Sequence, residues 1–177
     1  MRTSVLADHH INWISTQGGR FIALPDSSLA DWYGCPDDGR DPLDDSHDYG
    51  RACATSGYAD LLAVGKTHAL LFGENKLGGV WLESTNPILF EWICAESYDA
   101  VIEALARLPA DLDVNASLSF VAAMDHLNVF DSVFPGGEHE PQHSCRFPIQ
   151  PGSYTINSSI YQPNEETGLI VHRFTPA

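Results

Sequence analysis

The chain has 177 residues, of which 44% are hydrophobic and 10% aromatic, and this composition predicts a folded protein rather than a disordered acidic chain. Its 24 acidic residues outnumber nine Lys and Arg. The resulting formal charge of −15 argues against nucleic acid as a direct ligand, because phosphate binding needs a basic surface. No run approaches the ~18 apolar residues of a membrane helix and no apolar leader is present, so we expect a cytoplasmic protein without a membrane partner.

The first part of the chain predicts a strand pair, a short helix and a long acidic loop. Two apolar runs at 11–15 and 21–24 flank Gly18-Gly19, a glycine pair typical of a hairpin turn, so we expect these runs to pair as strands. A capping signal and apolar positions at helical spacing within 25–34 predict a short amphipathic helix that ends at a glycine. Residues 35–48 contain six aspartates and two prolines, which is the composition of an exposed, mobile loop.

The rest of the chain predicts mainly strands. Short apolar segments bounded by Gly, Pro or Asn predict an antiparallel meander at 58–64, 67–73, 79–84 and 87–95. Apolar residues at helical spacing predict one helix from Ser97 to Leu108. Further strands are predicted from a strict alternation at 111–120, a weaker pattern at 127–133, and closing segments at 144–149, 153–162 and 168–174.

These elements predict an α+β fold dominated by antiparallel strands, either a sandwich or a strongly curved sheet, with one or two packed helices. We expect residues 1–177 to form one domain, because no repeat and no long linker divides the chain. The four cysteines are widely separated and form no C-x-x-C pair, which predicts reduced thiols rather than a redox or zinc motif.

One motif suggests a metal centre. The sequence HEPQH, from His139 to His143, matches the H-E-x-x-H pattern of zinc peptidases, which requires both histidines on one face of a helix. Prolines within and beside the motif and two preceding glycines instead indicate a loop. A metal-binding β-sandwich or a metal-dependent enzyme that uses His139, His143 and Cys145 remains the alternative, since imidazole and thiolate suit zinc or copper. No other residues suggest a catalytic centre, and we expect neither an enzyme nor a cofactor.

A series of short motifs follows in order along the first half of the chain. They are WISTQGG (13–19), LP (24–25), WYG (32–34), DYGRAC (48–53), LLFGE (70–74), WL (81–82) and LFEW (89–92). In order and spacing they resemble the immunity protein 21 family of bacterial polymorphic toxin systems, over about residues 11–95 and more loosely beyond. Arg20 stands where the family usually has proline, Glu74-Asn75-Lys76 where it has Asp-Glu-Pro, and Glu91 where it has arginine. The motif residues expected to shape the fold are Gly18, Gly19, Trp32, Gly34, Tyr49, Cys53, Gly73, Glu74 and Trp92.

The resemblance implies an immunity protein, a stoichiometric inhibitor that binds a cognate toxin and occludes its active site. The charge of −15 predicts a basic toxin. An enzyme acting on nucleic acid fits this description, because an acidic surface could occupy its phosphate-binding groove. Asp48 and Arg51 either contact the toxin or pair with each other to hold the loop. The candidate toxin-binding residues are Asp37, Asp38, Asp41, Asp44, Asp45, Asp48 and Arg51.

Overall fold

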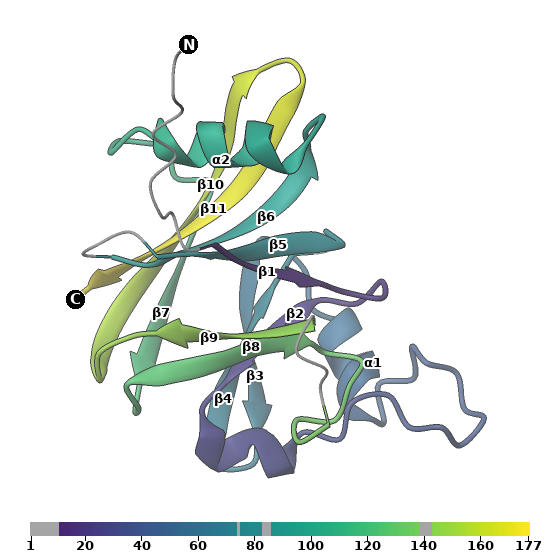
Figure 1. Cartoon of the computed structure of the whole chain (residues 1–177). Coiled ribbons are helices and arrows are strands. Elements are labelled where there is room, and N and C mark those ends of the chain that lie inside the picture. Colours follow the sequence, from purple (N-terminus) through teal and green to yellow (C-terminus); the bar gives the residue numbers. More distant parts are fainter. Residues whose placement is uncertain (1–10, 74, 83–85, 139–142) are drawn as a thin grey trace.

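The structure, a computed structural model, describes residues 11–73, 75–82, 86–138 and 143–177 of the chain. Two antiparallel sheets pack against each other, and a helix covers the outer face of one of them (Figure 1). Three short helices accompany the strands, so the predicted α+β class with mainly antiparallel strands is confirmed. Within the described residues, no helix is long and apolar enough to cross a membrane.

The larger sheet has six strands and the smaller sheet has five. Across the larger sheet the order is β1 (Ile11–Ser15), β5 (Leu77–Trp81), β6 (Ile88–Cys94), β11 (Thr167–Pro176), β10 (Gly152–Asn164) and β7 (Ala116–Ala122). Across the smaller sheet it is β3 (Ala59–Val64), β4 (Thr67–Phe72), β2 (Phe21–Leu24), β8 (His126–Asp131) and β9 (Ser144–Pro148). The helices are the 3-10 helix η1 (Asp26–Asp31) and the α-helices α1 (Asp48–Cys53) and α2 (Tyr98–Ala106).

Buried apolar side chains form three clusters. Residues of both sheets, such as Phe72 and Phe120, fill the space between the sheets. Helix α2 packs Val101 and Leu105 on the outer face of the larger sheet. The outer face of the smaller sheet is covered by Trp32 and by Ala52 of α1. Helix α1 is therefore fixed to the fold by burial, and with it the segments that lead into it.

The predicted hairpin between 11–15 and 21–24 is wrong. Strand β1 pairs with β5 in the larger sheet, whereas β2 lies between β4 and β8 in the smaller sheet. Every residue of β2 is buried, because this strand packs on both of its faces as a central strand. The glycine pair thus carries the chain from one sheet to the other rather than through a tight turn.

The predicted meander is also interrupted, because consecutive strands again belong to different sheets. Strands β3 and β4 pair with each other, and so do β5 and β6, but the two pairs belong to different sheets. The chain changes sheets at Gly73, whose φ of 34° lies in the left-handed region that favours glycine. Local apolar patterns identify strands but do not say which sheet each strand joins.

The helix predictions were closer. Helix α2 begins as expected, with the Ser97 hydroxyl accepting a hydrogen bond from the backbone N–H of Ala100 at 3.2 Å. The short helix predicted within 25–34 is η1, which ends before Trp32. The strand predicted at 111–120 begins only at Ala116. Leu112, which the alternation placed in this strand, packs beside α2 instead.

Candidate functional site

The acidic loop is joined to helix α1 by a buried histidine. His47 precedes the helix, and its Nδ1 accepts a hydrogen bond from the backbone N–H of Gly50 at 3.2 Å. Because Nδ1 is an acceptor, the ring proton sits on Nε2, which donates to the carbonyl of Asp41 at 3.1 Å. One imidazole therefore caps the helix and holds the middle of the loop. Figure 1 shows this loop projecting away from both sheets beside α1.

Gly50 lets the loop backbone lie directly on the helix. A Cβ added at this position would lie 1.9 Å from the carbonyl oxygen of Asp44, far inside van der Waals contact. With any other residue at this position, the helix and the loop would have to move apart to make room for the side chain. Sequence reasoning did not single out Gly50, although it is the central glycine of the DYGRAC motif.

Three aspartates of the loop stabilise its own turns. Asp38 forms an ion pair with Arg40 at 2.7 Å, and the hydrogen bond from Arg40 lowers the pKa of Asp38. Asp41 accepts a hydrogen bond from the backbone N–H of Leu43 at 2.9 Å. Asp44 accepts one from the backbone N–H of Ser46 at 2.8 Å, which lowers the pKa of Asp44. All three side chains therefore hold turns within the loop itself.

Two further aspartates, Asp37 and Asp45, are exposed, and within the described residues their side chains make no hydrogen bond or ion pair. They therefore contribute charge without a structural role. Two apolar side chains are presented to solvent here, Tyr33 just before the loop (73% exposed) and Leu43 within it (65% exposed). Sequence reasoning missed both. For Leu43 the available signal was a large apolar residue inside a segment rich in polar residues, Pro and Gly, whereas Tyr33 ends the predicted helix beside Trp32 and gave no such signal.

Asp48 and Arg51 connect the loop to the smaller sheet. One carboxylate oxygen of Asp48 accepts the backbone N–H of Tyr33 at 2.8 Å, and the other accepts Arg51 Nη1 at 3.0 Å. Arg51 also donates through Nη2 to the carbonyl of Ala63 in β3, at 2.6 Å. The two residues thus pair with each other, and together they attach both ends of the loop, at Tyr33 and at α1, to each other and to β3.

The glycines of the family motifs sit where a side chain would collide. A Cβ at Gly19 would lie 2.6 Å from the ring of Tyr49, and one at Gly34, whose φ is 65°, would lie 2.5 Å from the Val133 carbonyl. Gly18 faces open space, but its φ of 124° is one that other residues rarely adopt.

The other motif residues of this region are buried or half-buried. The indole of Trp32 is buried and donates to the Ser132 carbonyl at 3.1 Å. Burial raises the pKa values of both Tyr49 and Cys53, whose side chains hydrogen-bond to each other. Trp92 is half-buried against Trp13 and Tyr98. Glu74 lies outside the described residues.

The alternative metal site gains no support from His143 and Cys145, and His139 lies outside the described residues. His143 Nδ1 already bonds to the Ser15 hydroxyl at 2.8 Å. Burial raises the pKa of Cys145 to about 12, so its thiol is protonated and is a poor ligand. Among the residues that the structure describes, no group of His, Cys, Asp and Glu is arranged to hold a metal ion.

A buried chain of hydrogen bonds in the larger sheet resembles a serine–histidine–carboxylate triad. The Ser158 hydroxyl donates to His172 Nδ1 at 2.9 Å, and His172 Nε2 donates to Glu91 at 2.9 Å. Both His172 and Glu91 are fully buried and Ser158 is 1% exposed, so no substrate can reach the hydroxyl. Asn75 donates to the other oxygen of Glu91 at 3.0 Å. These hydrogen bonds join β10, β11 and β6 to the segment that enters β5. Because the hydroxyl is buried, the arrangement does not support catalysis.

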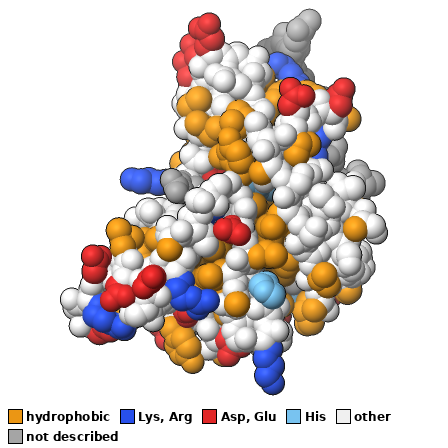
Figure 2. Space-filling model, turned by 180° about the vertical axis from the view of Figure 1, so that it is seen from behind, with side chains coloured by type: hydrophobic (Ala, Val, Ile, Leu, Met, Phe, Trp, Pro, Cys, Tyr) orange, Lys and Arg blue, Asp and Glu red, His pale blue; other side chains and the backbone are white. Residues whose placement is uncertain are grey.

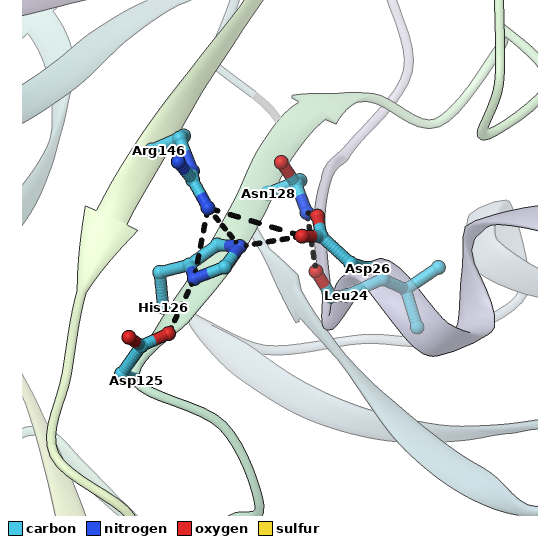
Figure 3. Close-up of polar contacts among 6 residues, drawn as sticks. All are labelled: Leu24, Asp26, Asp125, His126, Asn128 and Arg146. Carbon is cyan, nitrogen blue, oxygen red and sulfur yellow. Dashed lines mark hydrogen bonds and ion pairs between the residues drawn. The ribbon is translucent and has the colours of Figure 1, made fainter.

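A second polar cluster lies at the surface of the smaller sheet (Figure 3). His126 contacts Asp125 at 2.7 Å through Nδ1 and Asp26 at 3.0 Å through Nε2, and the Arg146 guanidinium lies against the ring. A hydrogen bond from Asn128, with further help from His126, lowers the pKa of Asp26. The carboxylates are already neutralised by cationic or donor groups, so the cluster fixes η1 to β8 and β9 rather than forming a ligand site.

A groove of about 720 Å³ is lined by apolar and uncharged polar residues and by the phenol of Tyr154, and none of its described lining residues is Asp, Glu, His, Lys or Arg. Phe147, Ile149, Tyr154 and Phe174 form its apolar walls. The Tyr154 hydroxyl donates to the Gln150 carbonyl at 2.8 Å, and no second acid or base of the described lining stands beside it.

Comparison with known proteins yields one match. The model of a family described as Immunity protein 21 matches residues 12–167. No curated protein and no solved structure matches the chain.

Proposed function

The chain belongs to the immunity protein 21 family, and from this premise we propose that it inactivates a basic cognate toxin by docking the acidic loop, residues 35–48, over the toxin's active site. The observation that carries this proposal is the combination of exposed charge with a backbone attached to the fold at several points. Stoichiometric inhibition needs a complementary surface and no chemistry of its own.

The charge of the loop fits a basic partner. Between residues 37 and 45 it has five aspartates and one arginine, in a chain whose net charge is −15. Such a field accelerates encounter with a cationic surface, commonly by about 10-fold to 1000-fold at low salt. A toxin that acts on nucleic acid has a basic groove, and carboxylates spaced along a loop can take the place of its phosphates.

Tyr33 and Leu43 are the candidate apolar anchors of the interface, whose burial would slow dissociation of the complex. Truncation of buried anchor side chains at protein interfaces costs about 2 kcal/mol or more of binding energy, whereas peripheral charges mainly affect the association rate. Both side chains are held outward on a backbone fixed by Asp48 and Asp41. We infer that they enter apolar depressions in the toxin beside its basic groove.

The charge is tested with Asp37→Asn combined with Asp45→Asn, since neither carboxylate has a structural partner in the described residues. The matched control is Glu165→Gln combined with Glu166→Gln, which removes the same charge from the exposed turn between β10 and β11. Association with the cognate toxin is measured by stopped flow at several salt concentrations. The loop variant should associate about threefold to tenfold more slowly at low salt and approach the wild type at high salt.

The anchors are tested by the dissociation rate. Tyr33→Ala and Leu43→Ala should each increase dissociation by about tenfold or more and leave the salt dependence unchanged. Protection of cells that produce the toxin should weaken in parallel. Equal effects of the loop and control charge variants, together with unchanged dissociation of both anchor variants, would place the toxin interface elsewhere on the protein.

A further inference from the structure

The two sheets have four edge strands, and three of them are protected against pairing with another chain. Charged residues, proline and covering side chains are the usual protection of such edges. Strand β9 has Arg146 and Pro148, and β3 has Asp60 together with the Arg51 side chain on its Ala63 carbonyl. Strand β1 has its Ser15 carbonyl and hydroxyl engaged by His143 from the segment that enters β9.

Strand β7 has none of these protections. Among the described strands, β7 pairs only with β10. Strand β3 contacts β7 but forms no backbone ladder with it in the described residues. From Val114 to Met124 the chain contains no charged residue and no proline. Leu118 and Phe120 face the core, whereas Val121 is 69% exposed and Val114 is 52% exposed.

The neighbouring face of β10 is uncharged as well. The exposed positions of β7 lie opposite small polar residues of β10, in the pairs Ser117 with Asn157, Ser119 with Thr155 and Val121 with Ser153. Figure 2 shows few charged side chains at its lower right, the side of the molecule on which β7 lies. In a protein of net charge −15, this edge is therefore a place where two copies can approach without placing carboxylates in contact.

We propose that β7 pairs antiparallel with β7 of a second copy of this chain, so that the two larger sheets become one continuous sheet. A two-fold axis at Ser119 places Ser119 opposite itself and Ser117 opposite Val121. Asp113 and Asp125 then lie beyond the paired segment. The lack of charge favours a second copy over the toxin, because a basic partner gains nothing at an uncharged edge.

The pairing is weak and reversible. Seven paired residues extend over roughly 24 Å, and a single strand-to-strand contact buries less than the about 1,200 Å² typical of stable complexes. Since each copy carries the same large negative charge, salt screens their repulsion and strengthens the dimer. This salt dependence is opposite to that of the proposed toxin complex, so a failure of one proposal can be told from a failure of the other.

Sedimentation velocity over a concentration series, from micromolar to about millimolar, tests the dimer. The mass of wild-type protein should rise from 19.4 kDa towards twice this value, and more readily at 500 mM than at 50 mM salt. Ser119→Lys places two ammonium groups at the axis and should weaken the dimer by tenfold or more. Ile160→Lys is the control, since it makes the same charge change at an exposed position of β10 beyond the end of β7.

Hydrogen exchange supplies a second readout that does not depend on a variant. Backbone amides of β7 should become more protected as wild-type concentration rises, while those of β3 and β9 stay unchanged. A mass of 19.4 kDa at every concentration overturns the proposal, as does a Ser119→Lys variant that dimerises like wild type. Protection of β7 that appears only when the toxin is added would make this edge a toxin contact and would equally overturn it.

Discussion

Replacing Gly50 with alanine should detach the acidic loop from helix α1 without changing any charge. The new Cβ would lie 1.9 Å from the Asp44 carbonyl oxygen, and because this is a backbone atom, neither a rotamer change nor a side-chain shift relieves the overlap. Overpacking of this kind costs up to about 3 kcal/mol. Alanine is favoured over glycine in a helix by about 1 kcal/mol, so the free energy of unfolding should fall by about 2 kcal/mol. For a chain of this length, that corresponds to a melting temperature lower by about 4–8 °C.

Urea unfolding followed by circular dichroism measures the change, and toxin binding by the same variant measures its functional consequence. Gly137→Ala is the matched control, because a Cβ there meets no atom within 4 Å and the residue does not have a left-handed φ. We expect Gly137→Ala to be neutral, and Gly50→Ala to bind toxin more weakly even at temperatures where it is fully folded. If Gly50→Ala is as stable as Gly137→Ala and binds as tightly, the contact between loop and helix is not what positions the loop.

Two further predictions concern buried groups. Glu91→Ala leaves the His172 Nε2–H and the Asn75 amide without their acceptor and should lower the free energy of unfolding by about 2–5 kcal/mol, measured by urea unfolding, whereas a cost below about 1 kcal/mol would show that these hydrogen bonds are dispensable. Burial raises the pKa of Cys145 from 9.0 to about 12, so the stability that its protonated thiol contributes is complete below pH 9 and is lost as pH rises towards 12. At pH 8.5 iodoacetamide should therefore modify the exposed Cys94 much faster than the half-buried Cys145, as judged by mass spectrometry.

The position of most strands could be predicted from the sequence, but their partners could not. Runs such as those at 21–24 and 67–72 are apolar enough to be buried in any arrangement, and pairing depends on contacts between distant segments. Strand β2 has partners that lie about 50 and about 100 residues further along the chain, and no local pattern encodes them. A glycine pair between two strands was a misleading signal because the same glycines allow a chain to cross between sheets.

Helix α1 escaped prediction for a different reason. Its N-cap is a histidine, which is not among the residues that usually signal a helix start, and its centre is a glycine, which disfavours helices. Both departures have a tertiary cause, since His47 reaches the Asp41 carbonyl and Gly50 admits the Asp44 backbone. The acidic composition of the loop could be identified in the sequence. Its attachment to the fold could not, because the contacts that produce it involve backbone atoms several residues apart.

Two positions that depart from the family pattern, 75 and 91, are in direct contact in the structure. The resemblance described above implies glutamate at position 75 and arginine at position 91, and here Asn75 Nδ2 donates to Glu91 at 3.0 Å. An acidic residue at 75 and a basic one at 91 would make an equivalent contact with the donor and acceptor exchanged. A carboxylate at both positions would instead repel. Asn75→Glu should therefore lower stability in this chain, and the added change Glu91→Arg should recover part of the loss, because His172 Nε2 can then accept from the guanidinium. A double variant no more stable than Asn75→Glu alone would mean that the two departures arose independently.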